Sequence, residues 1–237
     1  AIMGETISVN AKDGGAFDVY LAKPTASRRP APGVIIIQEA FGVTTWLKDI
    51  TDRFAAEGYV AAAPDFYWRF APNFAAGFDD EEALATARRH LQTIDHAAAV
   101  DDIDATSGAL KSMDECNGKI ATAGFCLGGT LAYLAAVRLD IDAAAAYYGT
   151  QIHEYLDEGS NLTCPTLFHM ADHDDFIRDE DVKEIFQALI GIPNLAVWTY
   201  DTGHAFANWD RPGAYDEELA EKAHARTFAV FDKLKQD

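Results

Sequence analysis

The sequence contains few basic residues. Its 19 Lys and Arg stand against 38 Asp and Glu, so the formal net charge at pH 7 is -19. No block of Lys and Arg supplies a local basic patch, and a chain this acidic repels phosphate groups. Nucleic acid is therefore not an expected partner, and we interpret the acidity as a solvated surface that aids solubility.

Cysteine and long apolar runs are also scarce. The three cysteines, Cys116, Cys126 and Cys164, form no disulfide framework and no paired zinc-ligand spacing. No apolar run is long enough to cross a bilayer, and the N-terminal residues lack the basic and apolar pattern of a signal peptide. We therefore expect a cytoplasmic protein with no membrane partner and at least one free thiol.

The apolar residues that are present indicate one globular unit. A length of 237 residues with 49% hydrophobic content predicts a single domain over residues 1–237. Residues 6–24, TISVNAKDGGAFDVYLAKP, alternate apolar and polar side chains around Asp-Gly-Gly, which predicts an antiparallel hairpin at a sheet edge. Beyond Pro32, short apolar runs alternate with helical patterns. This rhythm is typical of an α/β fold with a mostly parallel central sheet flanked by helices.

The positions of the strands and helices follow from the periodicity. Strands buried on both faces are expected at residues 34–37, 59–63, 119–123, 142–147, 166–170 and 196–200. Helices are expected around residues 47–54, ending at Gly58, at 179–190, ending at Gly191, and at 215–234. Residues 81–110 predict either one long helix or two shorter ones.

One short motif points to nucleophilic catalysis. Gly124-Phe125-Cys126-Leu127-Gly128 joins an expected strand to an expected helix, in the form of a nucleophile elbow with cysteine in the usual serine place. Glycines two positions on either side relieve the crowding of such a strained turn. The turn should aim Cys126 outward, and the positive end of the helix favours a thiolate. Cys116 and Cys164 lack the motif and are expected to be inert.

An elbow needs a general base and an acid, which in this arrangement follow the nucleophile in the order acid, then histidine. Strand 166–170 runs into ADHDDF and strand 196–200 runs into DTGHAF, so Asp174 and His204 are the candidates. Asp172 and Asp175 stand in the same loop, and the sequence pattern by itself does not choose among the three.

A metal site is the competing interpretation of this region. His169, Asp172, His173 and Asp174 have side chains of the kinds that bind zinc. We disfavour that interpretation because His169 belongs to a buried strand and no second ligand cluster is apparent. No metal and no cofactor are therefore expected.

Residues 65–78, DFYWRFAPNFAAGF, form an aromatic-rich loop. The loop is either an ordinary connection with some core anchors or an apolar wall beside the site, and both interpretations stay open. If the loop is a wall, Tyr67 and Trp68 are candidate substrate contacts.

Together these residues resemble the dienelactone hydrolase family of α/β-hydrolases over nearly the whole chain. The similarity lies in the blocks IIIQEAFGV, GFCLGGTLAYL, AYYG, LFHMADHDDF and GHAFA. The resemblance implies that Cys126, His204 and Asp174 form the catalytic triad. It also implies that Glu39 helps to activate the thiol, although Glu39 by itself would be interpreted as a solvated loop acid. The same resemblance assigns the oxyanion hole to the backbone N–H groups of Ala40 and Leu127.

The chain departs from the family pattern at two positions. Asn208 stands where the family has an arginine that binds a substrate carboxylate, and Leu84 aligns with a second such arginine, for which Arg88 or Arg89 could substitute. A neutral amide does not replace a bidentate guanidinium. The expected substrate is therefore a small ester or lactone that is less acidic than the family's dienelactone.

The resulting functional prediction is a hydrolase that cleaves a lactone or carboxylic ester through a thioester on Cys126. The alternatives are a carboxylesterase of broad range and a catalytically silent relative that binds a ligand or senses thiol chemistry. We expect a monomer or a small homo-oligomer.

Overall fold

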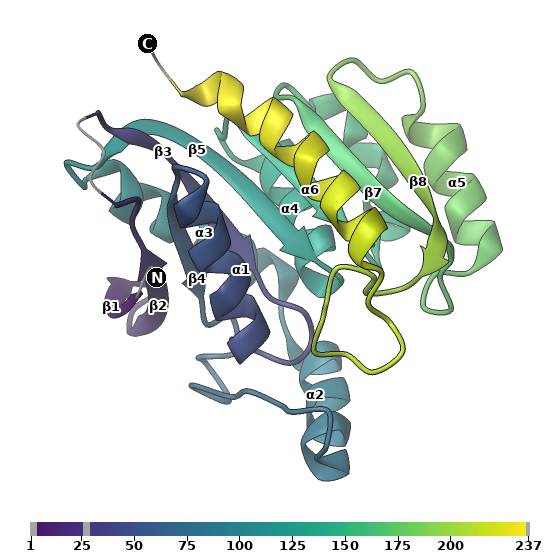
Figure 1. Ribbon diagram of the computed structural model, residues 1–237, viewed down its shortest axis with the longest axis horizontal. Coiled ribbons are helices and arrows are strands. Elements are labelled where there is room, and N and C mark those ends of the chain that lie inside the picture. Colours follow the sequence, from purple (N-terminus) through teal and green to yellow (C-terminus); the bar gives the residue numbers. More distant parts are fainter. Residues whose placement is uncertain (1–3, 26–28, 236–237) are drawn as a thin grey trace.

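The computed structural model describes residues 4–25 and 29–235, and its centre is one eight-stranded sheet (Figure 1). The strand order is β1-β2-β4-β3-β5-β6-β7-β8. The strands are β1 (Glu5–Asn10), β2 (Ala16–Ala22), β3 (Ala31–Ile37), β4 (Val60–Pro64), β5 (Cys116–Phe125), β6 (Ala143–Tyr147), β7 (Thr166–His173) and β8 (Leu195–Gly203). All pairs from β4 to β8 are parallel, whereas β1 and β2 form the predicted antiparallel hairpin at one edge.

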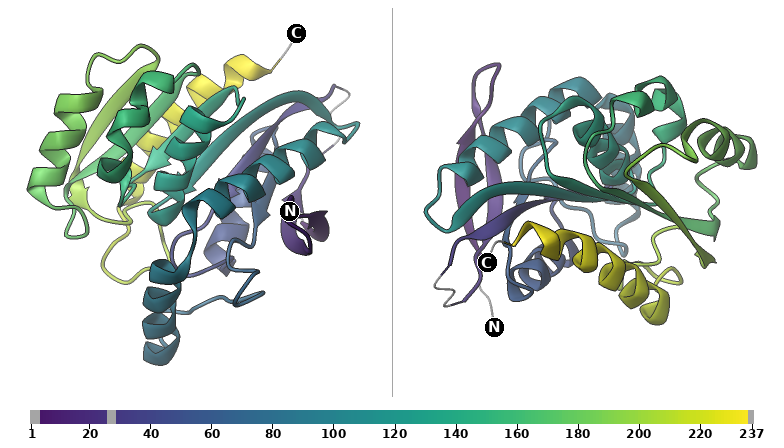
Figure 2. Two further views of the ribbon diagram at one scale, coloured as in Figure 1. Left: turned by 180° about the vertical axis from the view of Figure 1, so that it is seen from behind. Right: turned by 90° about the horizontal axis from the view of Figure 1, so that it is seen from above.

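Helices cover both faces of the sheet (Figure 2). The helices α1 (Thr45–Ala56) and α6 (Glu217–Phe231) lie on one face, and α3 (His96–Lys111), α4 (Leu127–Arg138) and α5 (Asp179–Leu189) lie on the other. The helix α2 (Glu81–Thr93) projects at one end of the molecule, and two 3₁₀ segments, η1 (Ile152–Asn161) and η2 (Asp232–Leu234), complete the fold. The two apolar layers between helices and sheet form the core.

Several boundaries differ from the predicted ones for identifiable reasons. Residues 81–110 form two helices, because Asp95 caps the second one by accepting a hydrogen bond from the Ala98 N–H. The helix α5 ends at Leu189, and Gly191 beyond it has φ of +84°. The helix α6 begins after Asp216, which caps it through the Leu219 N–H, and η1 was not predicted.

The prediction that every parallel strand is buried on both faces is wrong for β8. This strand lies at the sheet edge, where no further strand protects it, and Trp198 remains 39% exposed. The other parallel strands are buried almost throughout. Among the described residues, no helix is both long and apolar enough to span a membrane.

Candidate active site

The turn between β5 and α4 has the strained backbone that the elbow motif predicts. Cys126 has φ of +60°, a value that a residue with a side chain rarely adopts. A Cβ atom at Gly124 would collide with the carbonyl of Gly128, and one at Gly128 would collide with the carbonyl of Ile37. The flanking glycines are therefore needed because backbone from three segments converges at this turn.

The thiol is less open than predicted. Cys126 is 6% exposed, which is similar to the 8% of Cys116 and the 4% of Cys164. Surface exposure therefore does not distinguish the three cysteines, and the expectation of an outward, open thiol needs correction. Any preference for Cys126 must therefore come from its neighbours.

His204 lies beside the elbow and is oriented by Asp174. The Nδ1 atom of His204 and the Oδ2 atom of Asp174 are 2.7 Å apart, and both side chains are almost fully buried. Burial lowers the pKa of His204, but the nearby charge of Cys126 and the hydrogen bonds with Asp174 and Cys126 outweigh it and raise the pKa to about 10. The folded site therefore favours a protonated, positively charged His204.

The structure separates Asp174 from the other two acids of its loop. Asp174 accepts the hydrogen bond from His204 Nδ1 and also accepts one from the Phe176 N–H at 2.9 Å. Asp172 and Asp175 make no such contact with His204 among the described residues. Of the residues weighed as zinc ligands, His169 is fully buried and bonds Tyr200 and Thr227. No group of three or more metal-binding side chains is found within residues 4–25 and 29–235.

Glu39 is a buried acid rather than a solvated one. It is 2% exposed and accepts a hydrogen bond from the Asn208 side-chain amide at 2.7 Å through Oε1, while Oε2 has no hydrogen-bond partner among the described residues. Burial raises the pKa of Glu39, and the charge of His204, the bond from Asn208 and the charge of Arg211 oppose that rise. The amide at position 208 thus donates a hydrogen bond to Glu39 but brings no positive charge to it.

Ala40 lies in the turn after β3, next to the elbow. The N-terminal end of α4 packs against this turn, because Gly128 approaches the carbonyls of Ile37 and Gln38. The Ala40 N–H donates to no acceptor among the described residues. Leu127 is the first residue of α4, where a helix N–H has no partner within the helix. Both groups assigned to the oxyanion hole by resemblance therefore lie at the elbow.

The aromatic loop combines both interpretations left open by the sequence. Tyr67 is fully buried and its hydroxyl donates to the Ala40 carbonyl at 2.9 Å. Trp68 instead stacks on Phe17 of β2 and donates through Nε1 to Asp102 of α3 at 3.0 Å. Tyr67 therefore belongs to the site wall, whereas the described contacts of Trp68 anchor the loop to the hairpin and α3.

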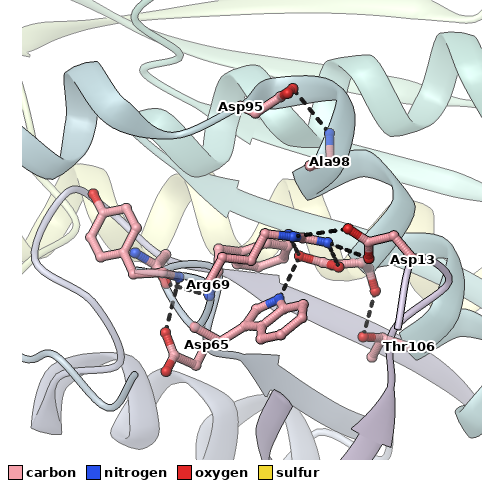
Figure 3. Close-up of polar contacts among 11 residues, drawn as sticks. Asp13, Asp65, Arg69, Asp95, Ala98 and Thr106 are labelled. Atoms are coloured by element: carbon pink, nitrogen blue, oxygen red, sulfur yellow. Dashed lines mark hydrogen bonds and ion pairs between the residues drawn. The ribbon is translucent and has the colours of Figure 1, made fainter. Parts of the chain in front are cut away.

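The loop's charged residues reinforce that anchor (Figure 3). Arg69 pairs with Asp102 at 2.8 Å and with Asp13 of the hairpin turn at 2.9 Å. Asp65 accepts hydrogen bonds from the backbone N–H groups of Tyr67 and Asn73, at 3.0 and 2.7 Å. The start of the loop is thus held from two sides.

Neither arginine proposed as a carboxylate clamp contacts the site. Arg88 and Arg89 are exposed on α2, and Arg89 donates to Thr86 of its own helix. The structure brings a different cation near: the guanidinium of Arg211 lies 5.2 Å from the ring centroid of Phe176, which in turn lies 4.6 Å from that of His204. Sequence reasoning missed Arg211 because its position, seven residues after His204, belongs to no motif.

The surroundings of Arg211 are aromatic rather than acidic. The rings of Phe41 and Phe78 lie 5.6 and 6.0 Å from the guanidinium carbon. No ion pair or side-chain hydrogen bond joins Arg211 to another residue in the described part of the chain. Arg211 is therefore a half-buried cation beside His204 that makes no ion pair in the described part of the chain, although its charge also lowers the pKa of Glu39.

Sequence reasoning also missed Tyr148. Its ring makes a T-shaped contact with His204 at 4.9 Å, and its backbone has φ of +41°. The charges of Glu39 and Cys126 both contribute, after burial, to raising its pKa. The signal available in the sequence was its place at the carboxyl end of β6, where site residues of a parallel sheet gather.

A cavity of about 530 Å³ lies beside the triad rather than on it. Its lining includes Trp46, Phe78 and Pro212. Phe78 also contacts the Arg211 guanidinium, and Trp46 donates to the carbonyl of Ala207 in the loop after His204. The cavity therefore borders the same loops that surround the site.

The geometry of the site agrees with the similarity of the chain to known proteins. A family model described as the dienelactone hydrolase family matches residues 17–235. The chain belongs to the dienelactone hydrolase family. This confirms the resemblance seen in the sequence and makes the chain a member of a family of hydrolases with the α/β-hydrolase fold.

Individual family members agree over nearly the whole chain. A carboxymethylenebutenolidase from Pseudomonas sp. (strain P51) is 32% identical over 234 residues, which cover 99% of this chain and 97% of the relative. Carboxymethylenebutenolidase 1 from Cupriavidus pinatubonensis (strain JMP 134 / LMG 1197) is 31% identical over 235 residues and 99% of both chains. A crystal structure from Klebsiella pneumoniae subsp. pneumoniae MGH 78578, provisionally named a dienelactone hydrolase, has a TM-score of 0.87 and 27% identity over 98% of this chain and 99% of its own.

Proposed function

We propose that the protein hydrolyses a small lactone or carboxylic ester through a covalent thioester on Cys126, with His204 and Asp174 completing the triad. The observation that carries this proposal is the strained elbow cysteine beside a buried histidine whose far nitrogen is 2.7 Å from a buried carboxylate. The relatives named carboxymethylenebutenolidase support a lactone among the substrates.

The reaction proceeds in two halves. The Cys126 sulfur attacks the carbonyl carbon, and the carbonyl electrons move to an oxyanion held by the N–H groups of Ala40 and Leu127. As the oxyanion collapses, the bond to the alkoxide oxygen breaks and His204 gives that oxygen a proton, leaving a thioester. With a lactone, the new hydroxyl stays attached to the acyl chain.

Water completes the turnover. His204, neutral again, takes a proton from water, and the resulting hydroxide adds to the thioester carbonyl. Collapse expels the Cys126 thiolate and releases a carboxylic acid. Asp174 holds the imidazole in the tautomer and orientation that both halves require.

We further propose that the substrate is less acidic than a carboxylate-bearing lactone. Asn208 supplies a neutral amide to Glu39 at 2.7 Å in place of a cation, so one strong anion contact is lost. This part of the proposal concerns substrate choice and leaves the ester chemistry unchanged.

The test is a hydrolysis screen of lactones and linear esters, each with and without a carboxylate, run with wild type and Cys126→Ala. Intact-mass spectrometry during turnover should detect an acyl adduct, and digestion should place it on Cys126. Rates that survive in Cys126→Ala, or an adduct on another residue, would remove the covalent mechanism. No turnover of any ester would favour the ligand-binding alternative, and similar rates for every ester and lactone would favour a broad carboxylesterase.

A further inference from the structure

We propose that Gln38 is a positioning residue for the oxyanion hole, because its side-chain amide fixes the peptide that carries the Ala40 N–H. The inference rests on the proposed function, in which that N–H stabilises the oxyanion. Gln38 touches neither the substrate nor the thiol and acts through the backbone.

The side chain of Gln38 forms a bridge between two backbone segments. It is fully buried, its Nε2 donates to the Glu39 carbonyl at 3.1 Å, and its Oε1 accepts from the Phe66 N–H at 3.0 Å. The Glu39 carbonyl and the Ala40 N–H are the two ends of one planar peptide unit and point in opposite directions. Holding the carbonyl therefore sets the direction of the N–H, and a donor on the carbonyl also polarises the N–H.

The peptide on the other side of Ala40 is held as well. The Tyr67 hydroxyl donates to the Ala40 carbonyl at 2.9 Å, and Tyr67 is fully buried. Burial raises the pKa of Tyr67, and the charge of Cys126 adds to that rise, so the two side chains interact electrostatically. Ala40 therefore lies between two side-chain clamps, while its own N–H is left without an acceptor in the described chain.

The clamp is itself supported. Phe66 and Tyr67 begin the loop that Asp65 ties to its own backbone and that Arg69 ties to Asp102 (Figure 3). On the opposite side, the Gln38 carbonyl lies against Gly128 of α4. Gln38 thus connects the oxyanion turn, the elbow helix and the anchored loop, and a buried amide with both ends satisfied holds one geometry.

A misaligned oxyanion donor affects the transition state more than the bound substrate. Removing one such donor outright costs about 10²–10³ in kcat. Loss of the Gln38 clamp misaligns the donor without deleting it, so we expect a smaller effect, about tenfold to a hundredfold in kcat, with KM little changed.

The test uses Gln38→Met, which keeps the length of the side chain and removes both hydrogen bonds. Ester hydrolysis is compared with alkylation of Cys126 by iodoacetamide at pH 7. In alkylation the sulfur forms a bond to a saturated carbon and iodide leaves with the electron pair, so no carbonyl oxyanion develops. Gln38→Met should lower the kcat of ester hydrolysis about tenfold to a hundredfold. Its rate of Cys126 alkylation should stay within about twofold of the wild-type rate.

Two further variants keep the test decisive. Thr51→Val removes a buried hydroxyl that bonds the Leu47 carbonyl within α1, away from the site, and controls for a general loss of stability. Gln38→Glu keeps the acceptor for Phe66 and can donate to the Glu39 carbonyl only when protonated. Its turnover relative to wild type should therefore fall as pH rises, with the melting temperature followed at each pH.

The outcomes separate the two levels of the proposal. If wild type forms an acyl adduct on Cys126 and Gln38→Met turns over normally, or loses ester turnover and alkylation equally, the positioning role is wrong. A turnover of Gln38→Glu relative to wild type that does not change with pH also contradicts the positioning role. If wild type hydrolyses esters without any adduct on Cys126, the proposed function fails, and the role of Gln38 fails with it.

Discussion

Cys126 differs from the other two cysteines in its neighbours and not in its burial. His204 lies beside it with a pKa raised to about 10, and the positive end of α4 begins at the next residue. Cys164, in contrast, has its pKa raised by burial in an apolar setting. Reactivity at this site is therefore a property of the local charge arrangement.

We predict that iodoacetamide at pH 7 labels Cys126 faster than Cys116 or Cys164, because a cationic His204 and the positive end of α4 lie beside its sulfur. Peptide mass spectrometry over a time course measures the three rates separately. His204→Ala should slow labelling of Cys126 and lower kcat by about 10²–10⁴-fold. Equal labelling of all three thiols would count against an activated cysteine.

The choice of acid can be tested within one loop. Asp174→Asn should lower kcat, because an amide holds the wrong tautomer of His204. Asp172→Asn is the matched control, since it removes a charge two residues away that has no described bond to His204. Steady-state kinetics of both variants measures the difference, and a larger loss from Asp172→Asn would identify the wrong acid.

At the level of elements, a buried polar network joins α6 to β6 and β7. Tyr147 bonds His224 and Thr227 at 2.9 and 2.8 Å, and Thr227 bonds His169 at 2.9 Å. Burial lowers the pKa of both histidines, to about 3 for His224, where the charges of Arg53 and Glu221 oppose each other. These histidines are held neutral in the folded protein.

This network makes stability fall in acid. Each histidine has a lowered folded pKa, so its contribution is complete above the unfolded value of about 6.5 and is lost as pH falls below it. At pH 5 the loss is about 2 kcal/mol for His224, whose folded pKa is about 3. For His169, the charges of His224 and Arg226 also disfavour protonation.

His169 and His224 together lower the free energy of unfolding in acid. We predict that His224→Gln reduces this loss by about half, because one of the two titrating groups is gone. Urea unfolding at pH 7 and pH 5 measures the change in the free energy of unfolding. His173→Gln, at an exposed histidine paired with Asp201, is the control. It should keep the wild-type difference in unfolding free energy between pH 7 and pH 5. If this difference in unfolding free energy is unchanged in His224→Gln, the network does not titrate as described.

At the level of the whole molecule, the net charge of the protein and the residues of the site both affect how well a negatively charged substrate binds. The net charge of -19 repels an anionic substrate, and Asn208 withholds a guanidinium. Arg211 opposes both effects, because its guanidinium lies one aromatic ring away from His204 and makes no ion pair among the described residues, although its charge also lowers the pKa of Glu39. The balance can be measured with matched substrates.

We predict that wild type has a higher kcat/KM for a methyl ester than for the matching free acid, and that added salt narrows the gap by screening the net charge. Arg211→Gln should lower kcat/KM for the acid form and leave the methyl ester nearly unchanged. Arg88→Gln, on exposed α2, is the matched control and should change neither. If wild type has a higher kcat/KM for the free acid, and Arg211→Gln keeps that preference, the roles assigned to Asn208 and Arg211 are both wrong.

The sequence by itself determined the order of strands and helices, and the two members of the triad, Cys126 and His204, that follow from motif and position. Glycines at 124 and 128 predict the elbow because only a residue without Cβ tolerates that crowding, and the collisions at both positions confirm it. His204 was likewise found from its place after the last strand, where the carboxyl edge of the sheet is built.

Only the tertiary structure decided the features that depend on residues distant in the chain. Asp174 was separated from Asp172 and Asp175 by a contact with His204 across 30 residues, and Glu39 was found buried and hydrogen-bonded to Asn208, 169 residues away. Arg211 and Gln38 belong to no motif, and their partners come from loops that the local sequence does not specify. Periodicity records which side chains face the core, whereas the angle at which separate loops meet depends on packing of the whole sheet and its helices. For this reason the chemistry of the nucleophile was readable in the sequence, and the charge and rigidity around it were not.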